Sequence, residues 1–158
     1  RIVRLASGVG IIRVGGATEV EMTEKKHRIE DALEAVKSAQ EEGIVGGGGT
    51  ALLRASTSLK FSELDNSDQA LGILIVKEAC KEPIKQMALN AGASPDLIIQ
   101  QVSSAEEDEG WDFRRGDIIN LYAEGIIDPV KVTRTALQNA ASCAGTLITT
   151  NFGIIQTE

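Results

Sequence analysis

The stretch "EEGIVGGGGTALLR", Glu41 to Arg54, decides how this chain is organised, because four consecutive glycines separate two charged, helix-like runs. Glycine adds no side chain to a core and loses more backbone entropy on folding than other residues. Something must therefore require bare backbone here. Two interpretations stay open from the residues alone. The glycines connect two closely packed helices, or they place the bare amides of a helix N-terminus against a ligand.

Two common phosphate-binding motifs do not fit this stretch. A Walker loop requires a lysine after its last glycine, and none follows here. A dinucleotide fingerprint can be forced onto Gly46, Gly48 and Ala51, but it requires a preceding strand. The pattern before it instead indicates a helix that ends at Gly43, so the required context is missing.

Composition limits the class of protein. A chain of 158 residues fits one ordinary domain, with or without a small appendage. Hydrophobic residues make up 42% but aromatic ones only 3%, which favours closely packed helices with Leu, Ile, Val and Ala in the core. The net charge of −7 argues against a nucleic-acid or membrane partner. No apolar run reaches the roughly 18 residues of a membrane span, and we recognise no signal peptide.

The two cysteines, Cys80 and Cys143, both lie in apolar helical patterns, so we expect buried thiols. Free buried thiols are typical of a reducing compartment. The only histidine, His27, stands alone and predicts surface rather than a metal site.

The pattern along the chain predicts a mainly α fold, with strand confined to residues 2–14 and to the tail, Phe152–Gln156. Thr18 and Glu21 form a capping box for a helix of some 24 residues that stops at Gly43. The first half of that helix is nearly all polar, which indicates an arm or a hinge. The segment Leu71–Val76 is apolar on nearly every face and should be buried.

Further helix signals follow the glycines. We expect helices over 50–60, from Ser67, from Pro83 to Gly92, from Ser94-Pro95, over 118–124, and from an Asp128 N-cap through Ile148. Residues 103–117 are charged and are expected to be irregular.

Four separated segments resemble one family in the same order and spacing: "VGGATEVEMTEKKHRIEDAL", "SAQEEGIVGGGGTALLRA", "EGIIDP" and "KVTRTALQNAAS". They resemble the group I chaperonins, the GroEL-type ATP-driven folding machines. The resemblance covers essentially the whole chain and corresponds to that family's C-terminal half. It implies the end of an apical domain over residues 1–9, a hinge-like intermediate segment over 10–42, and the C-terminal part of an equatorial ATPase domain over 43–158.

The resemblance implies a nucleotide role for several residues. Gly47 and Gly48 match glycines that let the ribose and adenine approach the backbone. Asp128 matches the acceptor of the ribose hydroxyls, a role compatible with its predicted cap. Asp112 and Phe113 match the adenine pocket, and Ile126 lies in the matching "EGIIDP" segment. Phe113 departs from the small residue usual there, and Arg114 is also unusual.

Asp31 carries the catalytic prediction. From the residues alone it forms a helical pair with Arg28 on a solvated face. By resemblance it is the hinge aspartate that reaches the γ-phosphate and Mg²⁺ and positions the attacking water. A carboxylate on a mobile arm suits that role, because hydrolysis would then wait for closure.

The resemblance implies ATP and Mg²⁺ as cofactors, with K⁺ as a further ion. It implies unfolded polypeptides and a co-chaperonin as partners of the complete protein, and a bacterial-type cytoplasm or an organelle matrix as its location. No complete metal site is expected within this chain. Because the family's phosphate-binding loop is not in this sequence, we expect the isolated chain to show no turnover and to self-associate. The alternative is a helical interaction module without ATPase activity.

Overall fold

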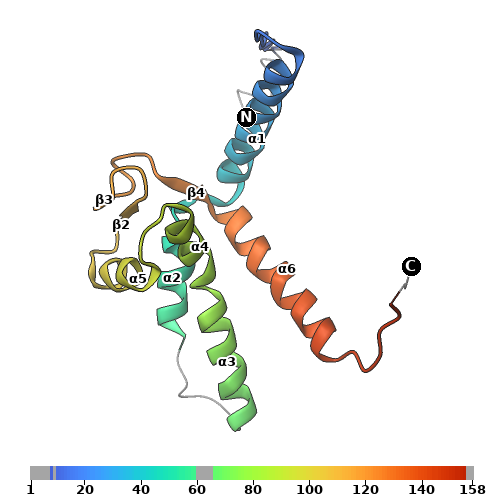
Figure 1. The fold of residues 1–158 in the computed structure, drawn as a ribbon, viewed down its shortest axis with the longest axis vertical. Helices are drawn as coiled ribbons and strands as arrows, with labels where there is room; N and C mark the ends of the chain where they lie inside the picture. Colours follow the sequence, from blue (N-terminus) through green and yellow to red (C-terminus); the bar gives the residue numbers. More distant parts are fainter. Residues whose placement is uncertain (1–7, 9, 60–65, 156–158) are drawn as a thin grey trace. The chain divides into compact units, whose positions relative to one another are not determined.

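The computed structural model describes residues 8, 10–59 and 66–155. The chain divides into two compact units, Arg1–Val36 and Lys37–Glu158, and the division falls within the first helix, α1 (Glu19–Glu42). Helices dominate both units, which confirms the mainly α prediction (Figure 1). The domain boundaries predicted near Val9 and Glu42 stay predictions, and Val9 lies outside the described residues.

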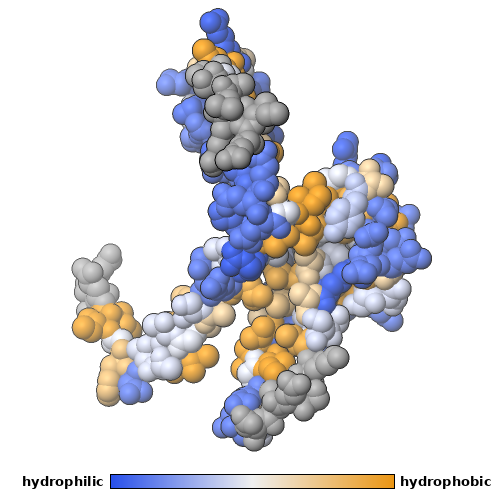
Figure 2. Space-filling model, turned by 180° about the vertical axis from the view of Figure 1, so that it is seen from behind, coloured by the Kyte–Doolittle hydropathy of each residue, from blue (hydrophilic) through white to orange (hydrophobic). Residues whose placement is uncertain are grey.

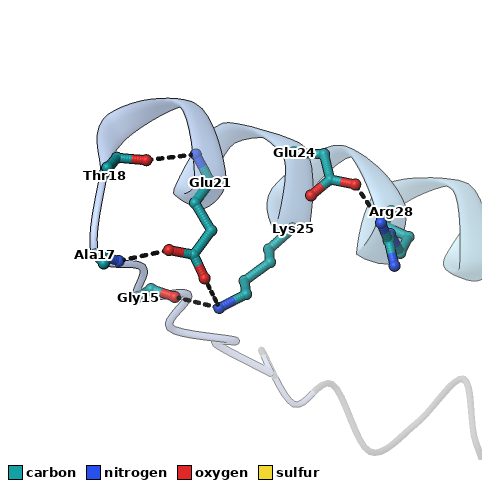
Figure 3. Close-up of polar contacts among 7 residues, drawn as sticks. All are labelled: Gly15, Ala17, Thr18, Glu21, Glu24, Lys25 and Arg28. Carbon is teal, nitrogen blue, oxygen red and sulfur yellow. Dashed lines mark hydrogen bonds and ion pairs between the residues drawn. The ribbon is translucent and has the colours of Figure 1, made fainter.

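The predicted capping box begins α1. Thr18 Oγ1 accepts a hydrogen bond from the Glu21 amide at 3.2 Å, and Glu21 Oε2 accepts one from the Ala17 amide at 2.8 Å (Figure 3). Lys25 Nζ lies 2.7 Å from Glu21 Oε1, and its hydrogen bond is the main reason that the pKa of Glu21 is lowered. Gly43 ends the helix with a positive φ of 87°, and its amide donates to Ala39 O at 2.8 Å.

The second unit contains the remaining helices and all the strands of the described residues. In chain order these are β1 (Ile44–Gly46), α2 (Thr50–Ser58), α3 (Ser67–Ala79), α4 (Glu82–Asn90), α5 (Pro95–Ser104), β2 (Glu109–Asp112), β3 (Asp117–Asn120), β4 (Ile127–Pro129) and α6 (Val130–Ile148). Its core lies among α2, α4 and α5 and is built from Leu53, Ile84, Ala88, Ile98 and Val102. This confirms that aliphatic side chains fill the core.

Most predicted helix starts hold to within one residue. Pro83 is the second residue of α4, and Ser94 is the N-cap of α5. The cap of α3 is Asn66 rather than Ser67, because Asn66 Oδ1 accepts from the amides of Asp68 and Gln69 at 3.1 and 2.9 Å. An asparagine side chain is as good an N-cap acceptor as serine, so two adjacent candidates could not be separated by residue type.

The predicted placement of strands is wrong. Residues 8, 10–14 and 150–155 contain no strand, and the rest of the two predicted terminal strands lies outside the described residues. The strands instead form two antiparallel pairs, β1 with β4 and β2 with β3. β1 and β4 are far apart in sequence, and pairing at such a separation leaves no local sequence pattern.

The helix predicted over 118–124 is also wrong, and so is the irregular assignment of the residues just before it. Glu109–Asp112 and Asp117–Asn120 form a hairpin, with Trp111 opposite Ile118. Gly116 has a φ of 78° in the connecting turn, a conformation that glycine adopts without steric cost. Hairpin pairing across this turn therefore overrides the helical preference of the short apolar run.

Two burial predictions are wrong. Leu71, Leu74, Ile75 and Val76 of α3 are exposed, and the Cys143 thiol on α6 is exposed, although Cys80 is buried as expected. Figure 2 shows apolar surface along α3 and near the C-terminal end of α6. Among the described residues, these four side chains of α3 keep between 38% and 58% of their surface exposed. None of the described helices combines the length and hydropathy needed to cross a membrane.

Candidate functional site

The glycine turn between β1 and α2 is fixed by close packing at two of its positions. The Gly47 amide donates to Ile126 O at 2.9 Å, and a Cβ on Gly47 would lie 3.1 Å from that oxygen. At Gly49 the φ is 76°, and a Cβ would lie 2.9 Å from Ile84 N. The turn therefore joins strand β1 to α2 and not two helices, which corrects the expected connector. A side chain at Gly49 would collide with backbone, and one at Gly47 would crowd the Ile126 carbonyl.

Gly48 is different, because it has room beside it. A Cβ there would make only ordinary contacts, 3.5 Å from Trp111 O and 4.0 Å from Phe113 Cε2, although its φ of 66° still favours glycine. Within the described residues, neither the Gly48 nor the Gly49 amide donates a hydrogen bond. These amides precede the first turn of α2, where unpaired N–H groups and the helix dipole favour a polar or anionic ligand.

β4 brings Asp128 to this turn, and Ile126 lies directly before β4. Val45 of β1 pairs with Asp128, Gly46 pairs with Ile127, and the Ile126 carbonyl receives the Gly47 amide. Asp128 is therefore a strand residue, and the N-cap of α6 is Pro129, which corrects the predicted cap role of Asp128. Strand pairing holds residues 127–129 extended, so the helix starts after them.

The carboxylate of Asp128 has no hydrogen bond or ion pair within the part of the chain that the structure describes. The residue is exposed, but neighbouring atoms displace part of the water around the carboxyl, and this desolvation raises its pKa. An acceptor that is neither paired nor capping is available to a ligand. Such a group, penalised by the fold in its charged form, is more typical of binding sites than of structural positions.

The tip of the β2–β3 hairpin supplies Asp112 and Phe113. Asp112 is 7% exposed, and its Oδ1 accepts from the Arg114 amide at 2.8 Å. The Phe113 ring packs against the aliphatic core, with its edge near Gly48. The large side chain at this position therefore turns inward and contributes to the core.

A cavity of about 530 Å³ lies beside the hairpin tip and is lined by Asp112, Arg114, Arg115, Glu124 and Ile126. This volume lies in the range of small-molecule sites. The structure thus brings together the predicted residues Gly47, Gly48, Asp112, Phe113, Ile126 and Asp128 around one turn and one hairpin. Their predicted roles stay predictions.

Three residues that line the cavity were not among the predicted site residues: Arg114, Arg115 and Glu124. Arg115 Nη2 lies 2.7 Å from Glu124 Oε2, and its Nε lies 3.6 Å from Asp112 Oδ2. The charged sequence from Arg114 to Asp117 was the available signal. It could not be used without knowing that a hairpin, and not an irregular loop, holds these residues.

Asp31 lies on α1 in the first unit, whereas the other predicted site residues lie in the second. The expected pair with Arg28 is wrong, because Arg28 pairs with Glu24 one turn earlier (Figure 3). Asp31 is exposed and has no hydrogen bond or ion pair among the described residues. His27 is also exposed, as expected.

The last turn of α1, which belongs to the second unit, is tied to the start of α6. Glu42 receives two hydrogen bonds from Arg134, Nη2 to Oε1 at 2.7 Å and Nε to Oε2 at 2.9 Å, and Glu41 pairs with Lys131. The Val130 amide donates to Gly43 O at 3.1 Å. These contacts surround the β1–β4 pair and fix the strand that carries Asp128.

The fold and site define a helical domain in which a glycine turn and an unpaired aspartate lie beside a hairpin whose tip borders a cavity. A sequence model of the TCP-1/cpn60 chaperonin family matches residues 3–157 of the chain. The chain therefore belongs to the TCP-1/cpn60 chaperonin family. This membership supports a chaperonin-type function in protein folding.

Proposed function

We propose that this chain supplies the base-and-ribose side of an ATP site in a chaperonin. The observation that carries the proposal is the unpaired Asp128 carboxylate, held by β4 next to the glycine turn. The free amides of Gly48 and Gly49 add donors at the N-terminus of α2. The cavity beside Asp112 and Ile126 is large enough for a nucleoside.

In this proposal each group has a defined task. Asp128 accepts hydrogen bonds from the ribose hydroxyls, and Gly48, which has room beside it, lets the sugar and base lie against bare backbone. Gly47 holds the turn against Ile126. Ile126, Asp112 and the region of Phe113 border the base. Asp31 would orient the attacking water and would be a carboxylate ligand for Mg²⁺, which usually takes one or two carboxylates together with phosphate oxygens and waters. K⁺ would assist at the phosphates.

The partners of the complete assembly are part of the same proposal. They are unfolded polypeptides and a co-chaperonin, in a bacterial-type cytoplasm or an organelle matrix. The competing proposal, a helical interaction module without ATPase activity, is favoured by the exposed apolar face of α3. Nucleotide binding separates the two.

The binding test is an NMR titration of the ¹⁵N-labelled chain with ADP up to millimolar concentration. We expect saturable shifts of the Gly48, Asp112 and Ile126 amides, and weaker binding in Asp128→Asn because a charge-assisted acceptor is lost. Asp96→Asn, an exposed aspartate on α5, is the matched control and should bind like the unmodified chain. An absence of saturable shifts would contradict the proposal and leave the interaction module.

The catalytic test concerns Asp31. The isolated chain should show no ATP turnover, and turnover that disappears in Asp31→Ala would contradict that expectation. In a complete chaperonin carrying this segment, Asp31→Ala should slow hydrolysis while leaving nucleotide affinity largely unchanged. Glu30→Ala, the neighbouring exposed acid, is the control. Loss of nucleotide binding in Asp31→Ala would show that Asp31 does not act on the water.

A further inference from the structure

The hairpin tip holds Arg114 in a fixed backbone position at the wall of the cavity. The Arg114 amide donates to the buried carboxylate of Asp112 at 2.8 Å, and the Gly116 amide donates to Asp112 O at 2.7 Å. A side-chain oxygen that bonds a backbone amide two residues ahead locks a turn locally. The backbone of Arg114 is therefore fixed by the turn, although its side chain is exposed.

The charges around the cavity leave the Arg114 guanidinium unpaired. Arg115 forms ion pairs with Glu124, Nη2 to Oε2 at 2.7 Å, and with Asp112, Nε to Oδ2 at 3.6 Å. Arg114 makes no side-chain hydrogen bond or ion pair with any residue that the structure describes. Of the charged side chains that line the cavity, Arg114 is thus the one available to a ligand.

The cavity has few surfaces against which a flat group could lie. Of its five described lining residues, Ile126 alone is apolar. Phe113, the aromatic ring nearest the turn, packs on the core and does not line the cavity. Two guanidinium planes line the cavity, and that of Arg115 is held by Glu124 and Asp112. The Arg114 guanidinium is the unpaired one, and arginine stacks on aromatic faces as well as pairing with anions.

We propose that the Arg114 guanidinium stacks on the base of the bound nucleotide, so that this site selects purines by their face area. The inference rests on the proposed nucleotide function and adds a residue and a selectivity to it. The strength of stacking does not depend on the hydrogen-bonding groups at the edge of the base, because every base has a π face. Adenine and guanine should therefore bind similarly, and the smaller pyrimidines should bind more weakly.

The test uses the ¹⁵N-labelled chain, titrated with AMP, GMP and UMP, and with ribose 5-phosphate as the probe that lacks a base. The amides of Gly48, Asp112 and Ile126 report binding. In the unmodified chain, AMP and GMP should have dissociation constants within about threefold of each other, and UMP should be several-fold weaker. Arg114→Ala should weaken AMP and GMP about two- to fivefold, the scale of an exposed cation–π contact, and should leave ribose 5-phosphate unchanged.

Two further variants separate stacking from charge. Arg114→Lys keeps the positive charge but loses the planar group, so it should lose most of the purine affinity that Arg114→Ala loses. Arg13→Ala removes an exposed arginine from the first unit and should bind like the unmodified chain. The pattern of amide shifts in each unbound variant checks that the hairpin is intact.

Each other outcome contradicts a specific statement. If Arg114→Ala weakens ribose 5-phosphate as much as AMP, the guanidinium binds the phosphate and the stacking proposal is wrong. If Arg114→Ala or Arg114→Lys binds AMP like the unmodified chain, or if UMP matches AMP, the proposal is also wrong while the nucleotide site stands. If the unmodified chain binds no nucleotide, the proposed function fails first.

Discussion

At the scale of single residues, the glycine run contains positions with different requirements. Gly49 combines a φ of 76° with a virtual Cβ contact of 2.9 Å to Ile84 N, whereas Gly145 on α6 has open space around it. Position 49 requires glycine both because its φ is positive and because a Cβ would clash. Position 145 gains nothing from glycine and loses helix propensity.

We therefore predict opposite effects of one substitution at these positions. Gly49→Ala should lower the free energy of unfolding by at least about 1–2 kcal/mol, because an L-residue in the left-handed region costs about that much before the clash is counted. Gly145→Ala should raise it by about 0.5–1 kcal/mol. Urea denaturation followed by the single Trp111 measures both. Equal effects would show that packing around Gly49 relaxes freely.

Asp128 gives a prediction about pH. Its pKa is raised by desolvation, so the folded state takes up a proton more readily than the unfolded chain does. The contribution of Asp128 to stability therefore grows as pH falls through the raised folded value, and its ionised form is unfavourable at neutral pH. Asp128→Asn should leave stability at pH 7 unchanged or slightly higher, and should remove that dependence on pH in the acid range.

The measurement for Asp128 is the unfolding midpoint between pH 3 and pH 7, compared with the Asp96→Asn control. A clear loss of stability in Asp128→Asn at pH 7 would mean that the carboxylate has a structural partner. The carboxylate would then not be free to bind a ribose.

At the scale of elements, short contacts between distant segments hold the site together. The last turn of α1, the β1–β4 pair and the first turns of α6 are joined by the Glu42–Arg134 and Glu41–Lys131 pairs. Exposed ion pairs contribute little individually, but a bidentate arginine–carboxylate pair also fixes geometry. In the hairpin, the buried Asp112 carboxylate likewise fixes local geometry, because it accepts a hydrogen bond from the Arg114 amide.

The Glu42 pair should appear in the acid stability of the protein. The hydrogen bonds from Arg134 are the main reason that the pKa of Glu42 lies below its ordinary value of 4.5. The stabilisation is therefore present above the unfolded pKa and is lost as pH falls through the lower folded value. Glu42→Gln should reduce the difference in stability between pH 6 and pH 3.

Glu107→Gln is the control for this prediction, because Glu107 is exposed and makes no ion pair in the described part of the chain. Chemical denaturation at each pH gives the comparison. The same pH dependence in Glu42→Gln and in the unmodified chain would show that the Arg134 pair does not persist in solution.

At the scale of the whole molecule, the apolar face of α3 lacks a partner among the described residues. Leu71 is 58% exposed and Ile75 is 57% exposed, one helical turn apart on the same face. Each 100 Å² of apolar surface left in water forgoes roughly 2.5 kcal/mol of burial. Contiguous exposed apolar surface on a helix therefore favours association.

We predict that the isolated chain self-associates through this face. Sedimentation velocity over a concentration series should show a rising average mass, and the double variant Leu71→Lys with Ile75→Lys should shift the chain toward monomer. Leu97→Lys, which changes an exposed leucine of α5, should leave the association unchanged. A monomer that persists at high micromolar concentration in the unmodified chain would contradict the prediction.

The sequence by itself determined the features that depend on neighbouring residues. Thr18, Glu21 and Gly43 specify the ends of α1, Pro83 and Ser94 mark helix starts, and the lack of aromatic residues predicts an aliphatic core. The segments around Gly47, Asp128 and Asp31 were enough to predict the family. Capping, turn and periodicity signals act over a few residues, so one sequence is sufficient to detect them.

Only the tertiary structure decided the features that depend on residues far apart. Pairing of β1 with β4 turned the expected cap Asp128 into a strand residue with an unpaired carboxylate. The β2–β3 hairpin replaced a predicted helix, turned Phe113 into the core and placed Arg114 at the cavity. The apolar run of α3 stayed exposed. A side chain's hydrophobicity is local, whereas its burial depends on whether the rest of the fold supplies a surface to cover it.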